Sequence, residues 1–318
     1  MPSLANRALR FSAQAPDEDD REDVQWNLAL AGGEGTRLDE YVQRRFGQSI
    51  PKQYCRLLGS RSMLEHTLGR LNQLTPPART LTVIGSEHGA HAMPQLARAS
   101  DHVFCQPRAR GTGVALYVAL AMIKRWNPNA VVTVTPTDHY VAPANRYLER
   151  VRLARHVSGR MRDVIAILGV APSEPDPELG YLRLGSALTE VPEAFRLNGF
   201  VEKPSVRDAS RLIAEGALWN TMVICGTVAA LWAMGRCTQP HLLDVLDGLV
   251  PLIGTSDEAD AIEYIYQAYP AIDFSTDVLQ RSTSPLVSIK LDDVEWSDWG
   301  RAERVEAVLA SRALRSST

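Results

Sequence analysis

A glycine-rich turn and two basic side chains near the start of the chain are of the residue types that bind phosphate groups. The apolar residues 26–31 predict a buried strand, which runs directly into GGEGTR, residues 32–37. Backbone N–H groups in such a turn can approach phosphate oxygens closely, because glycine has no Cβ atom. Arg37 adds a planar fork of donors and Lys52 adds a compact point charge. Together these residues predict a triphosphate site.

The glycine turn alone has a simpler interpretation, since a tight connection between a strand and a helix also favours glycine. Two better-known phosphate-binding patterns are excluded. GxGxxG cannot be aligned with GGEGTR in the right register, and no Gly-Lys-Ser/Thr of a P-loop follows. The specific feature is the order GGEGTRL and then PKQY, residues 51–54.

Further along, acidic and polar side chains follow segments that read as strands. The segment Pro136-Thr137-Asp138 comes directly after the β-branched residues 130–135, and the carboxyl ends of strands are where ligands bind in open parallel sheets. A carboxylate there can hold Mg²⁺ against a phosphate, or it can simply cap the turn. Glu202 and Lys203 offer an acceptor for sugar hydroxyls and a cation for a sugar phosphate, or a surface ion pair. Asn220 could bond a hydroxyl or end a strand.

The elements that must position these residues alternate between strand-like and helix-like patterns. Strands are expected at residues 80–85, 102–105, 130–135 and 163–170, with helices at 62–74, 90–99, 114–126 and 147–157. Helices are expected later at 206–215, 242–252, 257–269 and 302–313, and a strand at 286–291. This alternation predicts an α/β fold of Rossmann-like type, with a mainly parallel central sheet and helices on both faces.

Composition restricts the functional classes. The chain has 318 residues, 45% of them apolar, and a net charge of −3, which gives no general argument for binding nucleic acid or an anionic membrane. No apolar run reaches the roughly 20 residues that cross a bilayer, and the N-terminus lacks the apolar core of a signal peptide. Four scattered cysteines favour reduced thiols and a cytoplasmic location. Residues 1–23 are acidic and predict a flexible tail ahead of one domain, residues 24–318.

The order of the short motifs is more informative than any one of them. GGEGTRL, PKQY, QPRARGTG, PTDH, GY, VEKP, WN, PAIDFS and WSDWG follow one another along nearly the whole chain. This order resembles the sugar-1-phosphate nucleotidyltransferases, and in particular the mannose-1-phosphate guanylyltransferases. The resemblance implies a nucleotidyltransferase fold and a Mg²⁺-dependent reaction. In that reaction a sugar 1-phosphate attacks the α-phosphate of a nucleoside triphosphate and releases pyrophosphate.

The resemblance also implies roles for individual residues. The triphosphate would be held by Gly32, Gly33, Gly35, Thr36 and Arg37, with Lys52 neutralising the α-phosphate and the leaving pyrophosphate. The base and ribose would be bound by Gly85, Gln106, Gly111 and Thr112. The sugar would contact Gly180, Glu202 and Asn220, its phosphate would contact Lys203, and Mg²⁺ would be bound by Asp138 and Asp298.

Several departures from the family pattern keep alternatives open. After Trp219 and Asn220 the family usually has Ser-Gly-Met, whereas this chain has Thr221, Met222 and Val223, which could crowd the sugar site. The same chemistry with another sugar and nucleotide is therefore one alternative. Another is a catalytically silent relative that binds a nucleotide sugar and regulates a partner. The chain ends soon after WSDWG, so a single activity is expected, and self-association into a homo-oligomer stays open.

Overall fold

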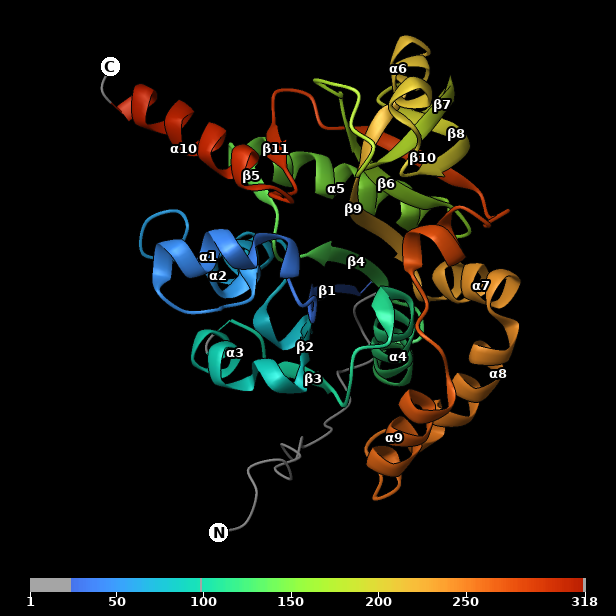
Figure 1. Cartoon of the computed structure of the whole chain (residues 1–318). Helices are drawn as coiled ribbons and strands as arrows, with labels where there is room; N and C mark the ends of the chain where they lie inside the picture. The colour runs from blue at the N-terminus through green and yellow to red at the C-terminus, as the bar shows by residue number, and fades with distance from the viewer. Residues whose placement is uncertain (1–23, 98, 317–318) are drawn as a thin grey trace.

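A nine-stranded sheet forms the centre of the computed structural model, which describes residues 24–97 and 99–316 (Figure 1). The strand order is β3-β2-β1-β4-β9-β6-β10-β8-β7. The strands are β1 (Gln25–Ala31), β2 (Thr80–Gly85), β3 (His102–Gln106), β4 (Val131–Pro136), β6 (Ile165–Val170), β7 (Gly180–Ala187), β8 (Ala194–Glu202), β9 (Leu218–Thr227) and β10 (Leu286–Lys290). The expected tail, residues 1–23, lies outside the described residues, so the division from residues 24–318 stays a prediction.

Parallel pairing is confined mainly to the first half of the sheet. Strand β1 lies between β2 and β4, β2 pairs with β3, and all three pairings are parallel. Their carboxyl ends therefore meet at one edge. Beyond β4, strand β9 runs antiparallel to both neighbours and β7 and β8 form an antiparallel hairpin, while β10 and β6 are parallel. The sequence pattern predicted the parallel half, and the second half is mixed.

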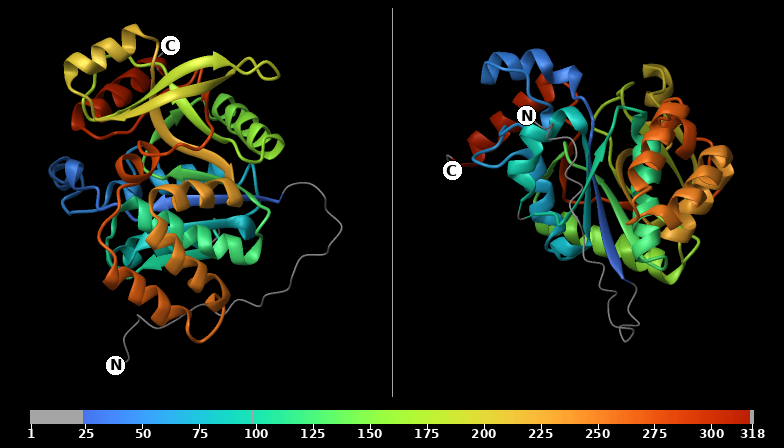
Figure 2. Two further views of the ribbon diagram at one scale, coloured as in Figure 1. Left: turned by 90° about the vertical axis from the view of Figure 1, so that its right-hand side faces the viewer. Right: turned by 90° about the horizontal axis from the view of Figure 1, so that it is seen from below.

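Helices cover both faces of the sheet, which confirms the predicted α/β class (Figure 2). They are α1 (Asp39–Phe46), α2 (Met63–Leu71), α3 (Gly89–Leu96), α4 (Gly111–Trp126), α5 (Ala144–Arg160), α6 (Val206–Ala214), α7 (Val228–Thr238), α8 (Pro240–Leu249), α9 (Glu258–Ala268) and α10 (Ala302–Ser316). Successive strand residues pack into different cores: Ile165 and Ile167 face α4, α7 and α8, whereas Ala166 and Leu168 face α5.

Helix α4 lies at the centre of the larger core. Every residue from Gly113 to Ile123 is buried, and a helix that is apolar on all sides can be stable only when it is surrounded by protein. Sequence periodicity placed this helix correctly. It missed α7, whose Val228–Thr238 segment continues directly from strand β9.

A second, two-stranded sheet lies beside the central one and carries part of the site. Strands β5 (Tyr140–Ala142) and β11 (Glu295–Ser297) pair antiparallel, and α10 follows β11. Val305 and Val308 of α10 belong to the same apolar cluster as Leu38 and Val42 near the N-terminus. The C-terminal helix is thereby packed against α1 (Figure 1). In the part of the chain described here, no helix is long and apolar enough to cross a membrane.

Candidate active site

Four parallel strands bring predicted site residues to one edge of the sheet. The glycine turn follows β1, Gly85 ends β2, Gln106 ends β3, and Asp138 comes just after β4. Gly85 is directly paired with Gln106. The sequence could predict this gathering, because the carboxyl ends of neighbouring parallel strands point to the same side.

Two glycines of the turn, Gly32 and Gly35, have close neighbours, whereas a Cβ atom on Gly33 would meet no atom within 4 Å. A Cβ atom on Gly32 would lie 2.0 Å from Nε2 of Gln106, and Gly35 has a φ of +67°, which favours glycine. The carbonyl groups of the turn point toward the PKQY segment. Gln53 Nε2 donates to the carbonyls of Ala31 and Gly33 at 2.9 and 2.8 Å. These two hydrogen bonds stabilise the conformation of the turn. Sequence analysis did not predict this role for Gln53.

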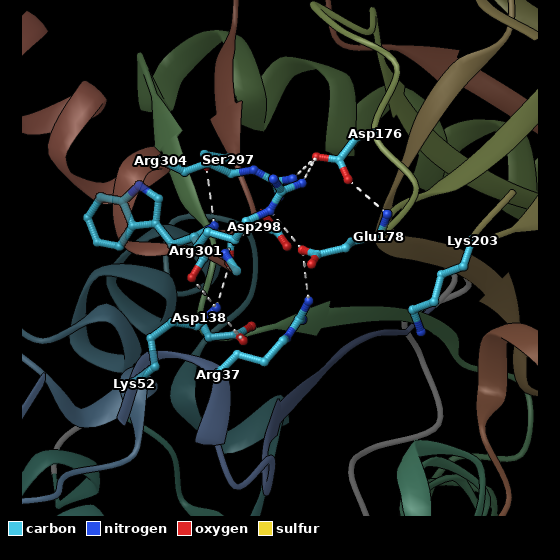
Figure 3. A network of polar contacts seen from close by, with 12 residues as sticks. Arg37, Lys52, Asp138, Asp176, Glu178, Lys203, Ser297, Asp298, Arg301 and Arg304 are labelled. Atoms are coloured by element: carbon cyan, nitrogen blue, oxygen red, sulfur yellow. Dashed lines mark hydrogen bonds and ion pairs between the residues drawn. The ribbon is translucent and has the colours of Figure 1, made fainter. Parts of the chain in front are cut away.

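The small β5–β11 sheet brings Asp138 and Asp298 together. Ser297 pairs with Tyr140, so continuing this antiparallel register places Asp298 beside the Asp138 segment. The Lys52 ammonium lies between them: its Nζ is 3.0 Å from Asp138 Oδ2 and 2.5 Å from the carbonyl oxygen of Asp298 (Figure 3). A third acceptor, the carbonyl of Trp299, lies at 3.3 Å. Lys52 is buried, and three acceptors match its three donors.

The charge on this cluster is set by Lys52. Burial by itself would raise the pKa of Asp138 and is the largest single effect, but the adjacent Lys52 ammonium and the other polar contacts of the carboxylate together outweigh it, and the pKa is lowered. Burial lowers the pKa of the neighbouring His139, which favours the neutral imidazole at pH 7. The site therefore holds an ionised carboxylate beside a neutral histidine, as suits a hard cation that prefers oxygen ligands.

Asp138 and Asp298 have the carboxylate side chains that a divalent metal shared with phosphate groups would use. Among the described residues, no cluster of three or more His, Cys, Asp and Glu side chains could form a complete protein cage for a metal. Mg²⁺ usually takes only one or two carboxylates and completes its octahedron with water and substrate phosphates. Asp138 and Asp298, next to the glycine turn, match this chemistry.

A chain of ion pairs surrounds Asp298 and reaches Arg37 (Figure 3). Arg304 pairs with both Asp298 and the buried Asp176. Arg301 Nη2 lies 2.8 Å from Asp176 Oδ2, and its Nε lies 3.0 Å from Glu178 Oε2. The guanidinium of Arg37 is 3.6 Å from the same Glu178 oxygen and is largely exposed.

Predicted sugar-binding residues form a separate group. Gly180 at the start of β7 pairs with Glu202 at the end of β8, and a Cβ atom on Gly180 would meet Glu202 Oε2 at 2.5 Å. Lys203 Nζ is 3.1 Å from Glu202 Oε1. Burial raises the pKa of Glu202, and the Lys203 ammonium opposes that shift. Lys203 lies apart from the Lys52 cluster (Figure 3).

Asn220 and Met222 show how the backbone accommodates Thr-Met-Val in place of the Ser-Gly-Met that the family usually has after Trp-Asn. Asn220 Oδ1 accepts a hydrogen bond of 2.9 Å from the backbone N–H of Met222. Met222 has a φ of +57°, a left-handed conformation that glycine adopts more easily. Its Sδ accepts a 3.4 Å hydrogen bond from Ser275 Oγ. The backbone therefore keeps a glycine-like conformation although the residue is methionine.

Three of the predicted base-binding residues have structural contacts. Thr112 Oγ1 accepts a 3.1 Å hydrogen bond from the N–H of Phe274, and a Cβ atom on Gly111 would lie 2.3 Å from the carbonyl oxygen of Ile272. Gln106 is buried, and its Oε1 accepts from the hydroxyl of Tyr266 at 3.3 Å. The contacts of Gly111 and Thr112 attach the PAIDFS segment to α4, the contact of Gln106 joins β3 to α9, and the expected base contacts stay predictions.

The structure thus brings Lys52, Asp138 and Asp298 into one cluster and places Gly180, Glu202 and Lys203 in another. Sequence analysis did not identify Asp176, Glu178, Arg301 and Arg304. The signal available was weak: an acidic pair in a proline-rich loop and two arginines near the start of the last helix, about 120 residues apart along the chain.

Comparison with known proteins shows the family to which the chain belongs. A family model described as nucleotidyl transferase matches residues 27–308. A mannose-1-phosphate guanylyltransferase of Salmonella montevideo is 30% identical over 202 residues, which cover 61% of this chain and 41% of that protein. Another of Klebsiella pneumoniae is 26% identical over 281 residues, which cover 86% of this chain and 57% of that protein. The chain therefore spans about half the length of these curated relatives.

Solved structures share the fold. A Thermus thermophilus structure described as mannose-1-phosphate geranyltransferase superposes with a TM-score of 0.76 at 28% identity, covering 88% of this chain and 78% of that one. A UTP-bound UGPase of Acinetobacter baumannii superposes with a TM-score of 0.55 at 14% identity, over 92% and 94% of the two chains, a likeness of fold alone. With a family model that spans residues 27–308, the chain belongs to the nucleotidyl transferase family.

Proposed function

We propose that this protein transfers a nucleotidyl group from a nucleoside triphosphate to a sugar 1-phosphate, with GTP and mannose 1-phosphate as the substrate pair. The observation that carries the proposal is the buried Lys52 ammonium next to the glycine turn, which contacts the carboxylate of Asp138 and the main-chain carbonyl of Asp298. The mannose-1-phosphate guanylyltransferases among the relatives supply the choice of substrates.

In the proposed reaction an oxygen of the sugar phosphate bonds to the α-phosphorus. The bond from that phosphorus to the bridging oxygen breaks, and pyrophosphate leaves with the electron pair. The attacking phosphate is already ionised at neutral pH, so no protein base is needed. Positioning and electrostatic stabilisation supply most of the catalysis in such transfers.

Each basic side chain has a distinct task in this scheme. The glycine turn holds the triphosphate, and Arg37 leaves its exposed contact with Glu178 to bind the phosphates. Lys52 exchanges its longest contact, to the Trp299 carbonyl, for a phosphate oxygen. Lys203 binds the sugar phosphate from the opposite side, while Glu202 and Asn220 bind sugar hydroxyls. The two anions would otherwise repel each other as they meet.

Asp138 and Asp298 would hold Mg²⁺ in this proposal. The ion would supply charge neutralisation for the triphosphate and the leaving pyrophosphate. Because Lys52 lowers the pKa of Asp138, that ligand stays ionised throughout the neutral range.

Two alternatives stay with the proposal. The first is the same reaction with another sugar or nucleotide, because Met222, two residues after Asn220, reshapes the predicted sugar site. The second is a silent relative that binds a nucleotide sugar. It is disfavoured because a pure binding protein has no need of two carboxylates and a buried lysine in one cluster.

The decisive experiment incubates the purified protein with Mg²⁺, mannose 1-phosphate and each of GTP, ATP, UTP, CTP and dTTP, and measures pyrophosphate release. Release with GTP alone supports the proposed pair, and release with another nucleotide keeps the reaction and changes the substrate. Other sugar 1-phosphates follow if mannose 1-phosphate is inert. No release with any pair, while a nucleotide sugar still binds, would replace the proposal with the silent alternative.

Lys52→Ala tests the residue that carries the argument. We expect it to reduce turnover by about 100-fold or more, since it removes preorganised charge from the reacting phosphates. Lys124→Gln is a matched control, because Lys124 also pairs with an aspartate, Asp247 at 3.0 Å, but lies outside the site. Wild-type turnover in folded Lys52→Ala protein would contradict the assignment.

The cellular setting is also part of the proposal. All four cysteines are free thiols, which supports the expected cytoplasmic location. The proposed partners are the nucleoside triphosphate and the sugar 1-phosphate, without nucleic acid or membrane. A homo-oligomer stays open, and light scattering of the purified chain would decide it.

A further inference from the structure

A fully buried carboxylate lies behind the site and has no part in the proposed transfer. Asp176 lies in the loop between β6 and β7, and its side chain is 0% exposed. Burying an ionised carboxylate is unfavourable unless it is paired and hydrogen-bonded. Asp176 meets both conditions: Oδ2 pairs with Arg301 and Arg304, and Oδ1 accepts a 2.8 Å hydrogen bond from the N–H of Glu178.

Two arms lead from Asp176 toward the proposed active site. One runs through Arg304, which also pairs with Oδ1 of Asp298. The N–H of Gly300 donates to the same Oδ1 at 3.1 Å. Oδ1 is therefore occupied by protein donors, and Oδ2 is left as the oxygen of Asp298 that can meet a ligand. The other arm runs through Arg301 and Glu178 to Arg37.

Burial decides which arm matters more. The side chains of Asp176, Arg304 and Asp298 are 0, 17 and 9% exposed, so their interactions are little screened by water. Arg37 and Glu178 are 58 and 39% exposed, and ion pairs at such positions contribute little. The Arg304 arm is thus the one that can fix a side chain.

We propose that Asp176 and Arg304 are positioning residues that orient the carboxylate of Asp298 so that Oδ2 faces the metal. The inference rests on the proposed function, because it takes Asp298 as a metal ligand. Neither Asp176 nor Arg304 contacts substrate: Asp176 holds the planar guanidinium of Arg304, and the guanidinium holds Oδ1. Residues that orient a metal ligand typically change metal affinity or activity by about 10–100-fold when they are replaced.

The test measures metal binding apart from turnover. Mn²⁺ is added to the protein without substrates, and the free ion is counted from its electron paramagnetic resonance signal. We expect Arg304→Gln to raise the Mn²⁺ dissociation constant about tenfold or more. The half-saturating Mg²⁺ concentration for pyrophosphate release should rise in parallel, while the KM for the sugar 1-phosphate should change less than about twofold, since that site is remote.

Three further variants separate positioning from folding. Arg304→Lys keeps a positive charge near Asp176 but lacks the fork that bridges two carboxylates, so it should stay folded and still bind Mn²⁺ weakly. Arg236→Gln removes a guanidinium shared by Asp244 and Asp247 on the surface and should leave Mn²⁺ binding unchanged. Arg301→Gln, in the more exposed arm, should raise the Mn²⁺ dissociation constant less than Arg304→Gln does.

A double-mutant cycle completes the argument. In an Asp298→Asn background, Arg304→Lys should add no further loss of Mn²⁺ affinity, because the carboxylate that it orients is gone. Additive losses would overturn the proposal, as would wild-type Mn²⁺ affinity in folded Arg304→Lys protein, or a wild-type protein that binds no Mn²⁺. If wild type binds Mn²⁺ but no substrate pair releases pyrophosphate, the proposed function fails while the positioning role is still tested by Mn²⁺.

Discussion

At the scale of single residues, the backbone conformation carries information that the residue types do not. Lys203, Met222 and Trp299 all have positive φ values, 47°, 57° and 48°, and all lie in the proposed site. Non-glycine residues held in this region cost about 1–3 kcal/mol each and persist only where the surrounding structure imposes them. Such conformations concentrate at functional sites. The sequence marked Met222 as a departure, but it could not show that the glycine-like conformation survives.

The left-handed conformation of Met222 predicts that glycine is more stable than alanine at this position, the reverse of the usual order. Alanine is ordinarily more stable than glycine, because glycine loses more entropy on folding. At a φ of +57° the left-handed penalty is larger than that entropy, so Met222→Gly should be more stable than Met222→Ala by about 1 kcal/mol. Urea unfolding of the two variants measures the difference. Ala310→Gly, at an exposed position in α10, is the control and should show the usual order. Equal stability of the two variants at position 222 would argue against strain.

At the scale of elements, the strands that sequence could predict are those with long apolar patterns. Strand β2 was predicted with the bounds that the structure gives it, Thr80–Gly85, since β-branched residues and a final glycine mark it. Strands β5 and β11 were missed, because each has only three residues and they lie far apart along the chain. Yet their pairing is what brings Asp298 to Lys52. The residues of the site were thus named from motifs, while the reason they meet became visible only in the fold.

The contact between α4 and the PAIDFS segment gives a prediction about elements. Gly111 has a φ of +74°, and a Cβ atom there would lie 2.3 Å from the carbonyl oxygen of Ile272. Gly111→Ala should therefore lower the free energy of unfolding by about 2–4 kcal/mol, through backbone strain and the displaced segment. Gly248→Ala in α8 meets no atom within 4 Å and should be neutral or slightly stabilising. Denaturant unfolding of both variants tests this, and equal stabilities would contradict both the backbone strain and the close contact with Ile272.

At the scale of the whole molecule, the ion pairs join segments that the chain order separates. Arg301 and Arg304, at the beginning of α10, reach Asp176 and Glu178 in the β6–β7 loop, and Glu178 reaches Arg37 beside β1. The apolar contact between α10 and α1 also joins the last helix to the segment that contains Arg37. Pairings of this kind depend on the completed fold. Local sequence patterns carry information on periods of a few residues, so they could predict the sheet edge but not this network.

Buried and partly buried histidines give a prediction for the molecule as a whole. Burial lowers the pKa of His66, His88, His102 and His139 below the ordinary value of 6.5. Unfolding restores that value, so below about pH 6.5 the unfolded chain binds more protons than the folded one, and the free energy of unfolding falls as pH is lowered. The pKa of Glu202 is raised, so its protonation increases the free energy of unfolding as pH is lowered, but it is one group against four histidines. We therefore expect lower stability at pH 5.5 than at pH 7.5.

Urea unfolding at pH 5.5, 6.5 and 7.5 measures this dependence, and a histidine variant identifies its source. His102→Gln retains a donor for the Ala78 carbonyl, which His102 Nε2 contacts at 3.1 Å, but it cannot take up a proton. The variant should lose less stability between pH 7.5 and 5.5 than the wild type does, whatever its stability at pH 7.5. His156→Gln is the matched control, because His156 is exposed on α5 and its replacement should leave the slope unchanged. A slope that His102→Gln does not reduce would mean that other groups set the acid sensitivity of this fold.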